Sequence, residues 1–187
     1  MIVTNFPHPM SLYPRYVKSH IDKLLALGCG ELRFELNLGA KLILGVDWAD
    51  AELDRAKEKE NAIVIKYDIL DVCEIIRNKS FDAVTLFDVL EHLTKGDALD
   101  LLKNLEEKVK YQIILFIPID AKWMNLEVVS RMQQERKDLN LSMGCHLSTW
   151  TPQELEELGF VGEYSPDFHH DKKMGAVFCV KNIHSTQ

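Results

Sequence analysis

Leu24-Leu25-Ala26-Leu27-Gly28-Cys29-Gly30 is the stretch of sequence that decides the fold. Its four apolar residues predict a buried strand, and the two glycines allow the chain to turn sharply into a following helix. Glycines at this place also let the backbone approach a ligand, because no side chain stands in the way. The pattern therefore predicts a strand, a glycine turn and a helix.

Similar apolar runs alternate with helical spacing along the rest of the chain. They predict further strands at residues 41–46, 62–66, 83–87, 113–117, 160–164 and 175–181. Runs that are apolar on both faces are typical of a parallel sheet covered by helices on both sides. The last two runs have no helix between them, so we expect an antiparallel hairpin at one edge of an α/β sheet.

Capping signals place two helices firmly. Thr94 precedes an apolar stripe at helical spacing and is a plausible N-cap. Thr151-Pro152-Gln153-Glu154 has the composition of a capping box with proline at the first helical position. Trp150 and Leu155 would add a hydrophobic staple around this cap. Shorter helices are expected over residues 50–60 and 69–77, and another from Glu31 to a stop at Gly39.

Acidic residues follow three successive predicted strands. Asp47 lies seventeen residues after Gly30, Asp68 follows the third strand, and Asp88 follows the fourth. An acid at the end of the second strand can accept hydrogen bonds from two ribose hydroxyls, each worth about 1.5–3 kcal/mol to a charged acceptor. The ordered set of glycines and acids indicates a ligand that contains a nucleoside, bound at the carboxyl ends of the strands.

Length and composition limit the remaining possibilities. The 187 residues are expected to form a single domain, with an N-terminal arm at 1–22 and an insertion at 119–149 that would cover a substrate. The net charge of −7 makes a nucleic-acid partner unlikely. No apolar run is long enough to span a bilayer, and no signal peptide is recognisable, so we expect a cytoplasmic protein without a membrane partner.

The chain resembles the class I S-adenosylmethionine-dependent methyltransferases. The resemblance covers roughly residues 23–180 and rests on a set of short motifs: Leu27-Gly28-Cys29-Gly30, Gly45-Val46-Asp47, Tyr67-Asp68-Ile69, Asp88-Val89-Leu90-Glu91-His92 and His146-Leu147-Ser148-Thr149-Trp150. It implies a Rossmann-like three-layer α/β sandwich around a seven-stranded, mostly parallel sheet with an antiparallel last strand. It also implies S-adenosylmethionine as the cofactor.

The resemblance assigns cofactor contacts to individual residues. The glycine turn would pack against the methionine part of the cofactor, Asp47 would hold the ribose, and Trp48 would lie beside the adenine. Asp68 and Ile69 would face the adenine, and the Phe87-Asp88 turn would face the methionine amino group. The implied set is Leu27, Gly28, Cys29, Gly30, Asp47, Trp48, Asp68, Ile69, Phe87 and Asp88.

Two positions depart from the family pattern. Ala26 stands where an acid usually helps to bind the methionine amino group, and Leu32 stands where a third glycine is usual. The missing acid predicts weaker cofactor binding or a substitute contact, for which Glu31 is one candidate. A degenerate domain that keeps the fold as a non-catalytic binding module is therefore an alternative.

The predicted function is in-line methyl transfer to a small-molecule or glycan acceptor. His146 is the best candidate for a general base, and His92 is a second, with a capping or orienting role as its alternative. No metal site is predicted, because His169-His170-Asp171 has no partner at a metal-ligand spacing. A nicotinamide-dependent oxidoreductase is a further alternative, disfavoured because Arg33 occupies the third glycine position of the dinucleotide motif. The sequence predicts no oligomeric state.

Overall fold

The computed structural model describes residues 1–119, 146–169 and 174–183. Within these residues eight strands form one sheet, in the order β1-β7-β8-β6-β5-β2-β3-β4. The strands are β1 (Ile2–Val3), β2 (Lys23–Leu27), β3 (Leu42–Asp47), β4 (Ala62–Lys66), β5 (Phe81–Phe87), β6 (Val109–Ile119), β7 (Val161–His169) and β8 (Met174–Asn182).

The strand directions confirm the predicted class of sheet. β4, β3, β2, β5 and β6 pair in parallel, and β8 runs antiparallel to both β6 and β7. All seven predicted strands are present. The sheet also has an eighth strand, β1, which pairs in parallel with β7. This strand was not predicted, because two exposed residues carry no periodic pattern.

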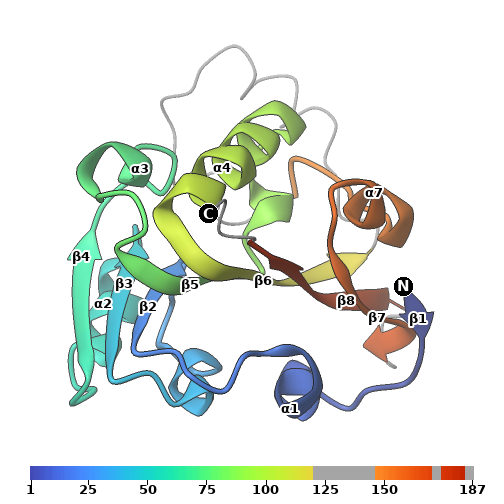
Figure 1. Ribbon diagram of the computed structural model, residues 1–187, viewed down its shortest axis with the longest axis horizontal. Coiled ribbons are helices and arrows are strands. Elements are labelled where there is room, and N and C mark those ends of the chain that lie inside the picture. Colours follow the sequence, from blue (N-terminus) through green and yellow to red (C-terminus); the bar gives the residue numbers. More distant parts are fainter. Residues whose placement is uncertain (120–145, 170–173, 184–187) are drawn as a thin grey trace.

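Helices cover both faces of the sheet, as Figure 1 shows. One face carries α3 (Val72–Ile75), α4 (Lys95–Lys108) and α7 (Pro152–Glu157), and the other carries α1 (Tyr13–Tyr16) and α2 (Asp50–Ala56). Short 3-10 turns complete the connections: η1 (Pro9–Leu12), η2 (Glu35–Leu38) and η3 (Leu90–His92). The three-layer sandwich is therefore confirmed.

Strand β2 illustrates how the sequence builds the two cores. Leu25 and Leu27 are buried with the side chains of α4 and α7, whereas Leu24 and Ala26 are buried with those of α1 and α2. Successive side chains of a strand point to opposite faces, so an uninterrupted apolar run fills both cores at once. The same strand ends at Leu27, directly before Gly28, so these cores hold the glycine turn in place.

The predicted caps are confirmed and the predicted helices are mostly too long. The side chain of Thr94 accepts a hydrogen bond from the amide of Asp97, and Thr151 and Glu154 form a complete capping box. The helix predicted over residues 50–60 ends at Ala56, and that over 69–77 spans only α3. The helix predicted from Glu31 is only the turn η2, although it ends at a left-handed Gly39 as expected.

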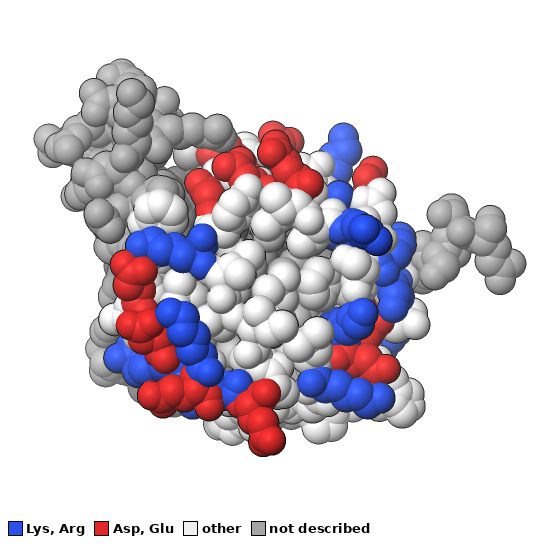
Figure 2. Space-filling view, turned by 90° about the vertical axis from the view of Figure 1, so that its left-hand side faces the viewer, with Lys and Arg blue, Asp and Glu red and all other residues white. Residues whose placement is uncertain are grey.

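The N-terminal residues pack against the sheet. Thr4, Arg15 and Tyr16 all bond the Glu163 carboxylate on β7, and Tyr13 is buried between Phe87 and Phe178. The predicted cover at 119–149 lies mostly outside the described residues, as does most of the His169-His170-Asp171 loop. Figure 2 faces the edge of the sheet at which β4 lies. It shows a central area without Lys, Arg, Asp or Glu side chains, with charged side chains around it.

Candidate functional site

The glycine turn after β2 requires glycine for two different reasons. Gly28 has a φ of +59°, and a Cβ at this position would lie 2.5 Å from Cγ2 of Val89. Gly30 has a φ of +47° but has open space around it. Gly28 is therefore needed for backbone conformation and close packing, whereas Gly30 keeps the turn open on the side where a ligand could approach.

The carboxylate of Asp47 holds this turn against the end of β3. One oxygen accepts a hydrogen bond from the Gly30 amide at 2.8 Å, and the other accepts from the amides of Trp48 and Ala49 at 2.6 and 3.0 Å. The amide of Cys29 donates in turn to the carbonyl of Val46. Asp47 is thus fixed at the carboxyl edge of the sheet, at the place predicted for a ribose ligand.

A cavity of about 260 Å³ opens at this edge. Its wall includes all four residues that the resemblance places near the nucleoside, together with Gly28, Asp88 and His92; the four are Asp47, Trp48, Asp68 and Ile69. Asp68 is held by the Leu70 amide, which donates to its carboxylate at 3.0 Å. The cavity confirms that the acids following β3, β4 and β5 meet around one space.

A second cavity of about 220 Å³ lies on the other side of the glycine turn. Gly28 borders both cavities, and Cys29, Gly30 and Phe87 line the second one. Of the predicted contacts, only Leu27 lines neither space, because its side chain is buried in the core. An elongated ligand lying across the turn would reach both cavities.

Two acids at this site have pKa values that are raised above their ordinary values. Asp88 lines the first cavity, and desolvation raises its pKa to about 6. Glu35 lines the second cavity, and burial together with the charge of Asp88 raises its pKa to about 7. Both groups are therefore costly to ionise in the free protein, and a bound cation would favour their charged forms.

The structure also clarifies the two departures from the family pattern. Ala26 is fully buried in the core on one face of the sheet and offers no carboxylate to a ligand. Leu32 adopts a left-handed φ of 62°, the conformation that a glycine would adopt without strain. Glu31 and Glu35 both line the second cavity, but Glu31 is already paired with Arg55 at 2.9 Å. Sequence reasoning missed Glu35, because an acid in an apolar turn carries no motif.

The two candidate catalytic histidines lie side by side. The ring of His146 packs edge-on against that of His92, with 5.2 Å between centroids. His92 lines the first cavity, while His146 is buried next to Glu91. The grouping of Glu91, His92 and His146 was not predicted, because 54 residues separate the two histidines in the sequence.

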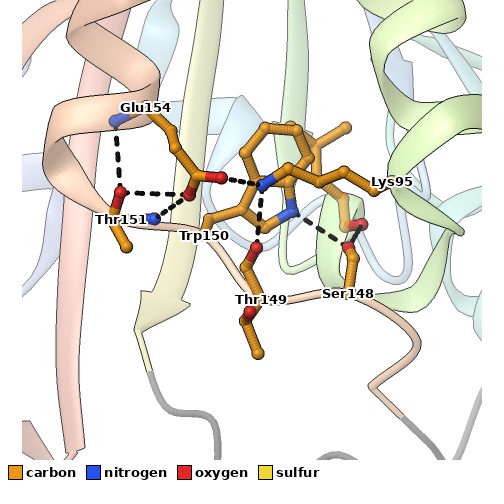
Figure 3. A network of polar contacts seen from close by, with 7 residues as sticks. Lys95, Ser148, Thr149, Trp150, Thr151 and Glu154 are labelled. Carbon is orange, nitrogen blue, oxygen red and sulfur yellow. Dashed lines mark hydrogen bonds and ion pairs between the residues drawn. The ribbon is translucent and has the colours of Figure 1, made fainter.

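A polar network fixes the segment that carries His146 (Figure 3). The amides of Leu147 and Ser148 donate to the carbonyl of Glu91 at 2.6 and 3.1 Å. Ser148 also links the indole nitrogen of Trp150 to the carbonyl of Leu90. These bonds tie the segment to η3, beside the first cavity.

Lys95 anchors the other end of the same segment. Its ammonium group lies 3.5 Å from the centre of the Trp150 ring, donates to the carbonyl of Thr149 and pairs with Glu154 at 2.9 Å. The capping box of α7 and the first turn of α4 are thereby joined through one cation. His146 therefore sits on a well-supported segment.

Comparison with known proteins supports the resemblance to methyltransferases. Residues 25–116 match the family model described as a methyltransferase domain. No protein of curated function matches the chain.

Several solved structures share the fold. The PH0226 protein from Pyrococcus horikoshii OT3 is 21% identical, with a TM-score of 0.62, over 92% of this chain and 88% of that one. A SAM-dependent methyltransferase from Archaeoglobus fulgidus is 18% identical, with a TM-score of 0.57, over 92% of each chain. Magnesium protoporphyrin IX methyltransferase from Synechocystis PCC 6803, solved with bound SAH, is 16% identical, with a TM-score of 0.60, over 94% of this chain and 80% of that one.

The matched residues run from β2 to β6 and include the glycine turn and all three acids at the strand ends. With this match the nicotinamide alternative loses its support. The chain contains a methyltransferase domain and shares the fold of S-adenosylmethionine-dependent methyltransferases.

Proposed function

We propose that this protein binds S-adenosylmethionine and transfers its methyl group to a small-molecule acceptor. The observation that carries the proposal is the pair of cavities separated by Gly28, with Asp47, Asp68 and Asp88 around the first. The adenosine part would occupy the first cavity, and the methionine part would lie across the glycine turn. The methyltransferase relatives with the same fold support this arrangement.

The nucleoside contacts follow from the first cavity. The ribose would lie near Asp47. The Asp47 carboxylate already accepts a hydrogen bond from the Gly30 amide and has lone pairs left for hydroxyl groups. Trp48 is 37% exposed and would offer its ring face to the adenine. Asp68 would face the amino group of the adenine, as the family resemblance implies. These contacts would come from the ends of β3 and β4.

The methionine ammonium group would need other partners in place of the acid that is missing at Ala26. Asp88 and Glu35 lie close enough for the charge of one to raise the pKa of the other. A cationic amino group between them would relieve this repulsion and supply the counter-ion that burial denies them. Glu35 is therefore our candidate for the substitute contact, in place of Glu31.

The chemistry asks little of the protein beyond alignment. The acceptor atom would attack the sulfonium methyl in line, forming a bond to carbon while the carbon–sulfur bond breaks and leaves a neutral thioether. Holding the reactants in this geometry can be worth about 7–11 kcal/mol. A general base would be needed only for an acceptor that loses its proton during attack, and His146 remains a prediction for that role.

A small acceptor fits the charge of the protein. The net charge is −7, which gives no support to a nucleic-acid acceptor. In the described part of the chain, no helix has the length and apolar character needed to cross a membrane. An acceptor that is a metabolite or a glycan group is the proposal that these features favour.

Calorimetric titration with S-adenosylmethionine, S-adenosylhomocysteine and NAD tests the proposal. The wild-type protein should bind the first two with micromolar affinity and NAD far more weakly. Asp47→Asn should weaken binding about tenfold or more, because a charge-assisted hydrogen bond to a ribose hydroxyl is lost. Asp54→Asn provides the matched control, since Asp54 is an exposed acid of α2 paired with Lys57.

Each other outcome has a definite meaning. Binding of NAD alone would overturn the cofactor assignment. A folded wild-type protein that binds none of the three would support the degenerate, non-catalytic domain. Equal binding by wild type and Asp47→Asn would remove Asp47 from the site, provided that both proteins unfold at the same temperature.

A further inference from the structure

A buried carboxylate without a hydrogen-bond partner lies behind the wall of the first cavity, with its Oε1 3.9 Å from Nε2 of His92. The side chain of Glu91 is almost fully enclosed, with the residue only 1% exposed. Neither of its oxygens has a hydrogen-bond partner among the described residues. A buried carboxyl group left in this way costs several kcal/mol relative to one that is paired. A ligand that bonds to the Glu91 carboxylate would recover this free energy.

Two imidazole groups complete a set of ligand atoms around this carboxylate. One oxygen of Glu91, one nitrogen of His92 and one nitrogen of His146 all lie within 4.8 Å of one another. The ligand atoms of a single zinc ion, each at about 2.0–2.2 Å from the metal, lie at most ~4 Å apart. Small side-chain rotations would therefore bring the three atoms to metal-binding distances.

We propose that Glu91, His92 and His146 form a binding site for a divalent transition-metal cation. Two imidazoles and one carboxylate suit Zn²⁺ and Co²⁺, and three protein ligands leave at least one coordination position open. The cation would supply the positive charge and the bonds that the Glu91 carboxylate lacks. The sequence did not predict this site, because its ligands come from two distant segments.

The backbone around the site is fixed in the way that metal ligands require. Glu91 and His92 are consecutive residues of η3. The Glu91 carbonyl accepts hydrogen bonds from the amides of Leu147 and Ser148, the two residues directly after His146. The Lys95 and Trp150 contacts hold the same segment from its other end. Such support outside the ligand shell typically changes metal affinity by about 10–100-fold.

The site borders the cavity proposed for the cofactor. His92 belongs to both, so the cation would lie at the cavity wall, where an oxygen atom of an acceptor could complete its coordination. This last point rests on the proposed function, whereas binding of the cation does not. With the cation bound, the two histidines would be ligands and would not act as general bases.

Titration of the purified full-length chain with Co²⁺, followed by competition with Zn²⁺, tests the site. The wild-type protein should bind one equivalent of Co²⁺ with the visible absorption of a four- or five-coordinate ion, and Zn²⁺ should displace it. Glu91→Gln and His146→Asn should each weaken Co²⁺ binding by about 100-fold or more, since removing even an outer-shell partner costs about 10–100-fold. His8→Ala and His20→Ala, which change exposed histidines, should leave the affinity unchanged.

Thermal unfolding provides a second readout that is independent of methyl transfer. Zn²⁺ should raise the melting temperature of the wild type and not that of Glu91→Gln, because only the folded wild type holds the site. Without added metal, Glu91→Gln should be at least as stable as the wild type, since it removes a buried acid. Failure of the wild type to bind Co²⁺ and Zn²⁺, or equal binding by Glu91→Gln and His146→Asn, would overturn the proposal whether or not the protein binds S-adenosylmethionine.

Discussion

Asp82 and Asp88 lie at opposite ends of the same strand, and their pKa values are shifted in opposite directions. Asp82, at the start of β5, accepts hydrogen bonds from the amides of Asp22 and Lys23 at 2.9 Å each and from the ammonium group of Lys110 at 2.8 Å. Burial alone would raise the pKa of Asp82, but these donors outweigh it and lower the pKa. Asp88, just after β5, has a pKa raised to about 6.

The difference extends to the two edges of the sheet. At the amino edge an acid is neutralised by the protein itself and serves the fold. At the carboxyl edge Glu35 and Glu91 are buried and Asp88 lines the first cavity, and each of the three acids has a raised pKa for which desolvation is the largest cause. Such a cluster of perturbed acids in a cavity is typical of a binding site. The comparison therefore supports the proposed binding site at the carboxyl edge and a stabilising role for Asp82 at the amino edge.

The largest effect on stability is expected from Asp82→Ala. This change leaves two backbone amides and one ammonium group without their acceptor, and we expect the free energy of unfolding to fall by about 3 kcal/mol. Urea denaturation of the wild type and the variant measures the loss. Asp54→Ala, an exposed acid in a single surface ion pair, should change little and is the control. A stable Asp82→Ala protein would remove the contrast between the two edges.

A somewhat smaller effect is expected from the ionisation of Glu35. Its pKa is raised from 4.5 to about 7 in the folded protein, so the folded state binds more protons than the unfolded state between these values. Stability should therefore fall as the pH rises from about 4.5 to about 7, with Glu35 contributing roughly 2 to 3 kcal/mol. Denaturation curves of wild type and Glu35→Gln at several pH values isolate this contribution. Parallel pH dependences for both proteins would show that Glu35 ionises normally.

The smallest effect on stability is expected from Asp88→Asn. Asn tolerates the left-handed φ of 55° at this position, and the neutral amide removes the repulsion between Asp88 and Glu35. The free energy of unfolding should change by less than about 1 kcal/mol, while the affinity for S-adenosylmethionine should fall by about 10–100-fold through loss of one charge-assisted bond. Thermal unfolding and calorimetric titration measure the two quantities. A loss of stability as large as that of Asp82→Ala would sink the functional reading of Asp88.

The sheet could be predicted because each of its main strands is a local apolar run. Gly28, Asp47, Asp68 and Asp88 could likewise be predicted, since parallel strands bring their carboxyl ends to one edge. β1 was missed because its pairing with β7 joins residues about 160 positions apart and leaves no local pattern. Such contacts follow from how the chain packs as a whole.

The chemistry around the cavities was predicted less completely for the same reason. Glu35 lies in a short turn without a motif, and only the packing of η2 shows that it faces the second cavity. Glu91 and His92 were visible as a pair, but His146 joins them through a contact between distant segments. The left-handed Leu32 could not be predicted either, because a leucine gives no signal for that conformation.

The most direct test of the binding role of the carboxyl edge is the proton count of cofactor binding. Titration with S-adenosylmethionine at pH 6.5, in buffers of different ionisation enthalpy, measures how many protons are exchanged. Asp88 and Glu35 should be partly protonated in the free protein, and a bound cation should lower both pKa values. We expect binding with a net release of protons that disappears in the Glu35→Gln, Asp88→Asn double variant. Absence of binding, or binding without any proton release, would contradict the assignment of these acids to the cofactor.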